Sequence, residues 1–181
     1  SVNTIILSND NLVGHNTDIT GFTKAIKNLN FNFKDKKIFI LGAGGVVPSI
    51  IFALGRMNVN EIIISNRTRQ KADNLKNQFK TLKVINWGNV PNFDVVINAT
   101  SLGLNNEVIN LDFSSIGENK LFYDVIYNPS CTNFLKIGKK LGNKSENGKL
   151  MFFYQASEAF KLWHGIEPRI NNETLKLLEN D

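Results

Sequence analysis

The segment KKIFILGAGGVVPSIIFALGRMNVNEIIISNRTRQK, residues 36–71, decides the fold of this chain of 181 residues. Residues 38–41 form a continuous apolar run, which is typical of a parallel strand covered on both faces. The glycine-rich stretch 42–45 predicts a tight turn, residues 46–57 a helix, and residues 61–65 a second strand. This order is the one that a dinucleotide-binding βαβ unit requires.

Further strands and helices alternate along the rest of the chain. We expect strands over residues 2–7, 82–87, 93–99 and 120–126, helices over 18–29, 71–79, 130–141, 150–163 and 173–179, a short return strand at 12–13, and a polar turn over 143–148. The alternation predicts the α/β class, with a Rossmann-like doubly wound parallel sheet and helices on both faces. The opening hairpin and the C-terminal helices fall outside it.

Composition restricts the class of protein. With 42% hydrophobic and 20% charged residues, the chain resembles ordinary globular proteins. The formal net charge is +5, but the basic residues are spread along the sequence, which argues against a nucleic-acid partner. One cysteine, Cys131, excludes an intrachain disulfide, and no apolar run approaches the length of a membrane span. We therefore expect a cytoplasmic location without membrane contact.

The glycine turn is the first candidate site. Its glycines let the backbone approach a pyrophosphate, whose charge the N–H groups at the helix start would hold. The candidate residues are Gly42, Ala43, Gly44, Gly45, Val46 and Val47. Val47 occupies the third small position of the G-x-G-x-x-G/A pattern, so the pattern is imperfect, and the turn could be purely structural.

Positive charge follows the second strand, where an NAD enzyme would place a carboxylate for the ribose 2′-hydroxyl. Arg67 and a second cation from Arg69 or Lys71 would bind a 2′-phosphate, while Asn66 and Thr68 could donate hydrogen bonds. The cofactor predicted is NADP(H). The alternative is a solvated basic turn with a helix cap.

Motifs from the whole chain resemble those of the NADP-dependent shikimate dehydrogenases. They are SVNT (1–4), GHNTD (14–18), GAGG (42–45), NRT (66–68), FDVVINATSLG (93–103), YDVIYNP (123–129) and NGKLMFFYQASEAFKLWHG (147–165). The resemblance implies reduction of 3-dehydroshikimate to shikimate, a step in the biosynthesis of aromatic amino acids.

The resemblance also implies roles for individual residues. Asn3, Asp18, Tyr127 and Gln155 would contact the substrate, and Asp18 would form half of a Lys/Asp pair that handles the proton. Without the resemblance, Asp18 would be interpreted as a helix cap, Asn3 as a polar strand residue and Gln155 as a satisfied polar group on an apolar helix.

Further cofactor contacts are implied in the second half of the chain. The residues are Thr100, Ser101 and Leu102 on the ribose and pyrophosphate side, and Val125 and Gly148 at the nicotinamide end. Two departures affect the nicotinamide end. Val125 stands where a methionine is common, and Lys149 follows Gly148 where many relatives have a second glycine.

The catalytic lysine of the family lies upstream of the SVNT-like motif, and no lysine here has a matching context. We therefore expect residues 1–18 to be the residual edge of a substrate domain, 19–148 an NADP-binding domain, and 149–181 helices that contact the substrate domain. The isolated chain is expected to bind NADPH without turning over shikimate. Surface left uncovered by a missing domain would favour self-association or a homodimer.

Other interpretations remain open. A quinate/shikimate dehydrogenase of broader specificity and a non-catalytic NADP-binding regulatory domain would share these motifs. His15 and His164 lack neighbours at metal-ligand spacing, so no metal site is expected. Cys131 at a helix start is better explained by packing than by reactivity.

Overall fold

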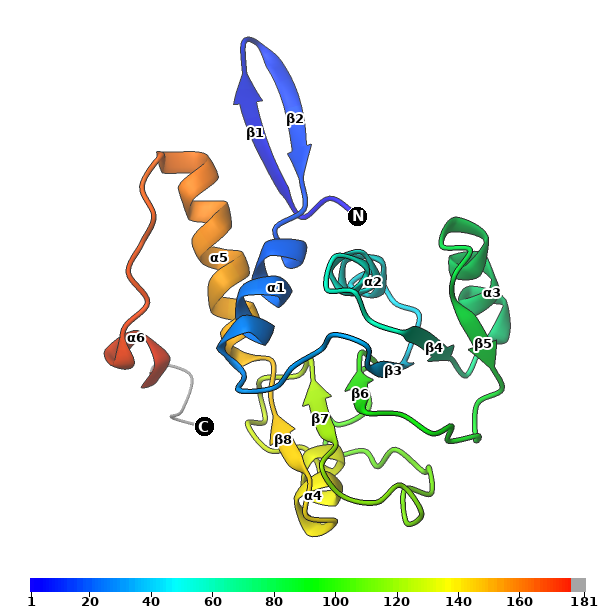
Figure 1. Cartoon of the computed structure of the whole chain (residues 1–181). Coiled ribbons are helices and arrows are strands. Elements are labelled where there is room, and N and C mark those ends of the chain that lie inside the picture. Colours follow the sequence, from blue (N-terminus) through cyan, green and yellow to red (C-terminus); the bar gives the residue numbers. More distant parts are fainter. Residues whose placement is uncertain (177–181) are drawn as a thin grey trace.

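Six parallel strands form the central sheet of the protein, for which a computed structural model describes residues 1–176 (Figure 1). Their order across the sheet is β5-β4-β3-β6-β7-β8. The strands are β3 (Lys37–Leu41), β4 (Glu61–Ser65), β5 (Lys83–Ile85), β6 (Val95–Asn98), β7 (Leu121–Asp124) and β8 (Lys144–Glu146). The chain builds outward from β3 to β5 and then continues on the other side of β3. This reversal creates a crevice at the carboxyl ends of β3 and β6.

Both faces of the sheet are covered, as the apolar run predicts. Ile38 and Ile40 belong to one apolar cluster, while Phe39 and Leu41 belong to another, because successive side chains of a strand point to opposite faces. The doubly wound architecture predicted from the sequence is therefore confirmed.

Helices α1, α2, α3 and α5 cover the first face, and α4 covers the second together with residues 102–116. Phe22, Ile50 and Met151 represent the first cluster; Phe113 and Phe134 represent the second. The helices are α1 (Asp18–Asn28), α2 (Val47–Gly55), α3 (Arg69–Gln78), α4 (Asn133–Lys140), α5 (Lys149–His164) and α6 (Asn172–Lys176).

A two-stranded antiparallel hairpin, β1 (Thr4–Ser8) and β2 (Asn11–His15), projects away from the sheet and helices (Figure 1). The side chains of Ile5, Leu7 and Leu12 are more than half exposed on it. Trp163, near the end of α5, donates a hydrogen bond from Nε1 to the Ile5 carbonyl at 3.0 Å. The hairpin therefore presents apolar surface and contacts the body through α5.

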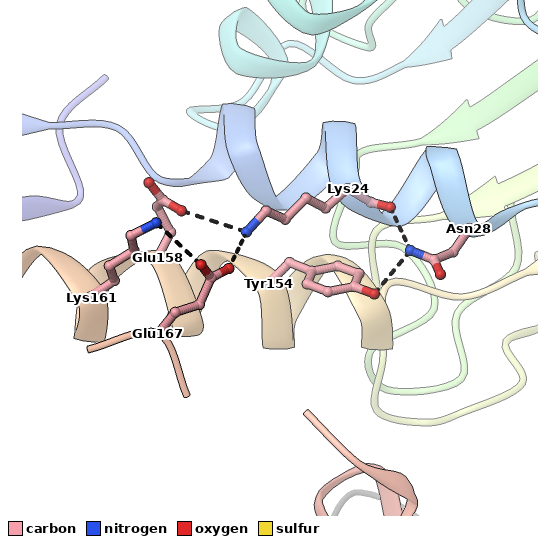
Figure 2. A network of polar contacts seen from close by, with 6 residues as sticks. All are labelled: Lys24, Asn28, Tyr154, Glu158, Lys161 and Glu167. Atoms are coloured by element: carbon pink, nitrogen blue, oxygen red, sulfur yellow. Dashed lines mark hydrogen bonds and ion pairs between the residues drawn. The ribbon is translucent and has the colours of Figure 1, made fainter. Parts of the chain in front are cut away.

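Helices α1 and α5 lie side by side (Figures 1 and 2). A β carbon on Gly21 would lie 2.8 Å from both Gln155 Cβ and the Met151 carbonyl oxygen. Only glycine therefore permits this close approach. Polar contacts at the edge of the interface join Lys24 to Glu167 at 2.9 Å (Figure 2).

Two sequence predictions of local structure are wrong. Residues 143–148, predicted as a polar turn, contain β8, which pairs with β7 in parallel. This short edge strand has no apolar alternation, so its sequence resembles a turn. The interpretation of Asp18 as a helix cap also fails, because the N-terminus of α1 has no side-chain cap hydrogen bond. The helix predicted over 173–179 is found as α6 in part, and residues 177–179 lie outside the described residues.

Candidate functional site

A cavity of about 440 Å³ lies at the carboxyl ends of β3, β4 and β6, where the strand order reverses. Three loops that follow these strands form most of its wall. The lining residues are Gly42, Ala43, Gly44, Asn66, Arg67, Thr68, Lys71, Trp87, Ala99, Thr100, Ser101, Leu102, Val108 and Asn110. The glycine turn, the basic turn and the loop after β6 thus meet at one place.

Gly42 makes the turn at the end of β3 possible. Its φ of 109° is one that other residues rarely adopt, and a β carbon would lie 2.7 Å from the Ala99 carbonyl oxygen. At Gly44, in contrast, a β carbon would meet nothing within 4 Å. The space beside Gly44 is thus open and lies next to the N-terminus of α2, whose positive dipole end favours an anion. This geometry fits a bound pyrophosphate.

The other predicted residues of the turn lie differently. Gly45 is exposed, and its carbonyl oxygen accepts a hydrogen bond from Ser1 Oγ at 2.7 Å. Val46 faces a second cavity, described below. Val47 is fully buried in the core, so the departure from the glycine pattern at this position serves packing of α2.

Two cations line the cavity at the basic turn, Arg67 and Lys71. Arg69 instead lies 3.5 Å from Asp73 and also hydrogen-bonds Asn86. The structure therefore distinguishes the two candidates for the second cation, since Lys71 faces the cavity and Arg69 is engaged along α3 and with residue 86.

The side chain of Asn66 holds the backbone of the basic turn in place. Asn66 donates a hydrogen bond from Nδ2 to the Thr68 carbonyl at 2.7 Å. This contact fixes the bend that leads from β4 into α3. Thr68 lines the cavity, and its hydroxyl group does not cap α3.

A second cavity, of about 550 Å³, shares residues 99–101 with the first. Its lining includes Val46, Leu104 and the segment from Val125 to Asn128. Tyr127 is held there by stacking on Phe152 of α5, with ring centroids 4.5 Å apart. The predicted nicotinamide-side residue Val125 and the predicted substrate residue Tyr127 thus line one cavity.

Gly148 lies beneath this second cavity, and the residues that line the two cavities do not include it. Its N–H donates to the Ile126 carbonyl at 3.1 Å. The contact joins the start of α5 to the segment that carries Val125 and Tyr127. Gly148 therefore supports the wall of the cavity.

The remaining predicted substrate residues gather at the start of α1. Asn3 Oδ1 accepts hydrogen bonds from the Thr17 N–H at 2.9 Å and from Thr17 Oγ1 at 3.2 Å. Thr17 Oγ1 also lies 3.3 Å from Gln155 Oε1. Burial raises the pKa of the adjacent Asp18, and a hydrogen bond with Asn3 partly opposes that rise. Asn3, Asp18 and Gln155, which are far apart in sequence, thus form one polar cluster.

Asn16 joins this cluster to the glycine turn. It donates from Nδ2 to Ser49 Oγ at 2.8 Å, in the first turn of α2, and accepts from the Asp18 N–H at 3.1 Å. Asn16, Thr17 and Ser49 were not predicted as site residues. The GHNTD motif contained the signal for the first two, while Ser49 had none beyond its place in the first turn of α2.

Among residues 1–176, no group of three or more His, Cys, Asp or Glu side chains could hold a metal ion. His164 packs against the Phe160 ring at 4.4 Å between centroids. No helix in the described part of the chain is long and apolar enough to cross a bilayer.

Known proteins resemble this chain over nearly its whole length. Residues 23–115 match the family model "Shikimate / quinate 5-dehydrogenase". The shikimate dehydrogenase (NADP(+)) of Pelagibacter ubique is 50% identical over 180 residues, which are 99% of this chain and 68% of that protein. This chain therefore spans about two thirds of the length of that relative.

Two solved structures share the fold and differ in their ligands. The shikimate 5-dehydrogenase of Thermus thermophilus, in complex with NADP(H) and shikimate, has a TM-score of 0.85 and 31% identity, and the match covers 98% of this chain and 67% of that one. The quinate dehydrogenase of Corynebacterium glutamicum, in complex with NAD, has a TM-score of 0.86 and 26% identity, with 99% and 67% covered. The fold alone does not distinguish these cofactors.

Proposed function

Since this chain belongs to the shikimate/quinate 5-dehydrogenase family, we propose that it is the cofactor-binding part of an NADP-dependent shikimate dehydrogenase. The reaction is the reduction of 3-dehydroshikimate to shikimate with NADPH. One observation carries the proposal. Arg67 and Lys71 line the same cavity as the open space beside Gly44, so a dinucleotide with a 2′-phosphate finds both of its anionic groups matched.

Bound NADPH would supply the hydride, and the chain's own residues bind and orient it. The turn at residues 42–45 and the N-terminus of α2 receive the pyrophosphate. Arg67 and Lys71 receive the 2′-phosphate. Thr100 and Ser101 border both cavities, Leu102 lines the first and Val125 the second, so these residues suit the ribose and nicotinamide ends.

Asn3, Gln155 and Tyr127 are proposed to hold the hydroxyl groups of the substrate. Reduction of a ketone develops alkoxide charge, which needs a proton donor. Asp18 is proposed to orient a lysine that supplies this proton, and the half-buried position of its carboxyl group suits a short charged contact. The family motif that carries this lysine has no match among residues 1–181.

We also propose that the chain alone does not turn over shikimate. The proposed division is a substrate-domain edge (1–18), an NADP-binding domain (19–148) and helices that contact the substrate domain (149–181). Val2, Leu12, Trp163 and Ile166 are each more than half exposed, so this surface suits a substrate domain or a second copy of the chain. Light scattering that reports a monodisperse monomer, without binding of an apolar dye, would contradict self-association.

The decisive experiment is a titration of the purified chain with NADPH and NADH, followed by a turnover assay with NADP+ and shikimate. We expect tight binding of NADPH, weaker binding of NADH, and no turnover. Equal affinity for the two cofactors would refute the 2′-phosphate site. Robust oxidation of shikimate would refute the proposed incompleteness and leave the cofactor site intact.

A second candidate is a quinate/shikimate dehydrogenase of broader specificity, which the similarity to the NAD-bound quinate dehydrogenase favours. Steady-state rates with quinate and shikimate, measured on the chain joined to a substrate domain, separate the two functions. A non-catalytic NADP-binding regulatory domain predicts NADPH binding without turnover of either substrate in that assembly.

A further inference from the structure

A buried polar network lies next to residues 99–101, which line both cavities. Asn98 at the end of β6 and Asp124 at the end of β7 are both fully buried, and Thr132 is 2% exposed. Asn98 Nδ2 donates to Asp124 Oδ1 at 3.0 Å across the two neighbouring strands. Buried polar groups are stable where they find partners, and the partners of this pair come from the loop 99–102, the segment 125–127 and the start of α4.

Asn98 holds the loop that follows β6. Its Oδ1 accepts from the Thr100 N–H at 3.1 Å and from the Thr100 hydroxyl at 2.7 Å. Its Nδ2 also donates to the Leu102 carbonyl at 3.1 Å, while the Leu102 N–H donates to the Thr100 hydroxyl at 3.1 Å. The conformation of residues 99–102 is therefore set by one buried amide; residues 99–101 line both cavities, and Leu102 lines the first.

Asp124 holds the other two segments. Its Oδ1 accepts from the Ile126 N–H at 3.0 Å, and its Oδ2 accepts from the Thr132 hydroxyl at 2.6 Å. Ile126 lies between Val125 and Tyr127 in the wall of the second cavity, and Thr132 is the N-cap of α4. One carboxylate thus ties residues 125–127 and α4 to the Asn98 loop.

We propose that Asp124 and Asn98 are positioning residues, which fix the loop 99–102 and the segment 125–127 relative to each other and so shape the site for the nicotinamide half of the cofactor. Neither residue lines the two cavities, so both act through the backbone they hold. The effect on cofactor binding rests on the proposed function, whereas the effect on the loops does not.

The test compares three variants with the unchanged chain. Asp124→Ala and Asn98→Ala remove acceptors from buried N–H groups. Asp124→Asn keeps an acceptor oxygen for Asn98 and Ile126, and its amide can donate to the Thr132 hydroxyl. Measurements are hydrogen exchange of the Thr100, Leu102 and Ile126 amides, and the dissociation constant for NADPH.

Asn143→Ala is the matched control. Asn143 is also a buried amide, and it holds a loop at the opposite end of the sheet by accepting from the Lys120 N–H at 2.8 Å and donating to the Gly117 carbonyl at 3.1 Å. Its loss is expected to lower thermal stability without changing exchange in residues 99–102 or 126. It therefore separates general destabilisation from positioning.

For Asp124→Ala and Asn98→Ala we expect faster exchange at the three amides and weaker NADPH binding by about tenfold, which corresponds to the loss of one buried hydrogen-bonded partner. For Asp124→Asn we expect amide exchange rates and an affinity for NADPH close to those of the unchanged chain. The proposal is overturned if the alanine variants leave exchange at these amides unchanged, or if Asn143→Ala produces the same loop exchange. If the unchanged chain binds no NADPH while the exchange results hold, the proposed function fails and the positioning role stands.

Discussion

A β carbon on Gly148 would lie 2.0 Å from the carbonyl oxygen of Val125, far inside any nonbonded contact. The first residue before α5 therefore touches the backbone of the segment that lines the second cavity. The resemblance to the family assigned both residues to the nicotinamide end. Val125 lines the cavity, and Gly148, without a side chain, lets α5 start directly behind Val125.

Gly148→Ala is expected to destabilise the chain by about 1–3 kcal/mol, as overpacked core substitutions do. The backbone around Val125 or the start of α5 must shift to admit the methyl group. Chemical denaturation measures the loss, and chemical shifts of the Tyr127 amide report the displacement. The matched control is Gly55→Ala, at the exposed end of α2, where a β carbon meets nothing within 4 Å. There we expect no loss of stability, and equal effects at both positions would contradict the argument.

The basic turn gives a prediction about cofactor choice. Arg67→Ala and Lys71→Ala are each expected to weaken NADPH binding by about tenfold and to leave NADH binding nearly unchanged, because each would remove one proposed charge-assisted contact to the 2′-phosphate. Fluorescence titration with both cofactors measures the ratio of affinities.

Arg69→Ala is the control for this series, since Arg69 pairs with Asp73 and does not line the cavity. We expect it to keep the preference for NADPH within about twofold. A larger loss of preference in Arg69→Ala than in Lys71→Ala would reverse the assignment of the second cation.

Asp124 gives a prediction about pH. Burial raises the pKa of its carboxyl group to about 6, and the hydrogen bonds from Thr132, Ile126 and Asn98 oppose that rise. The folded state therefore binds the proton more tightly than the unfolded state, whose pKa is near 3.8. The contribution of this group to stability is present in full below about pH 4 and is lost as the pH rises to about 6.

The free energy of unfolding of the unchanged chain, compared with that of Asp124→Asn, should accordingly fall between about pH 4 and pH 6 and stay level above. Urea denaturation at several pH values measures this difference. Asp18 and Glu146 also have raised pKa values, mainly through burial, but they titrate in both proteins and drop out of the comparison. A difference that rises with pH over this interval would show that the carboxyl pKa is lowered instead.

The sequence predicted the sheet well where local pattern decides structure. The apolar run in β3 and the glycine turn specify their own conformations, and β8 was missed because a polar three-residue edge strand is specified by its partner. The contact between the buried side chains of Asn98 and Asp124 was not predicted, for a similar reason. Each is a single polar residue at the end of an apolar strand, and the sequence does not indicate its partner, because the neighbouring strand 26 positions away supplies it.

The contact between α1 and α5 gives the last prediction. Gly21→Ala places a methyl group 2.8 Å from Gln155 Cβ and the Met151 carbonyl oxygen, so the helices must separate. We expect a loss of about 1–3 kcal/mol in stability and a displacement of Gln155 from Thr17. Denaturation and the chemical shift of the Gln155 side-chain amide measure the two effects.

Glu167→Gln is the comparison, because it removes the ion pairs with Lys24 and Lys161 at the exposed edge of the same interface (Figure 2). Exposed ion pairs contribute little and are screened by salt, so we expect a small change that vanishes at high ionic strength. The shift of Gln155 should remain as in the unchanged chain. If Glu167→Gln moved Gln155 as far as Gly21→Ala does, charge at the edge, and not close packing at Gly21, would hold this proposed substrate residue in place.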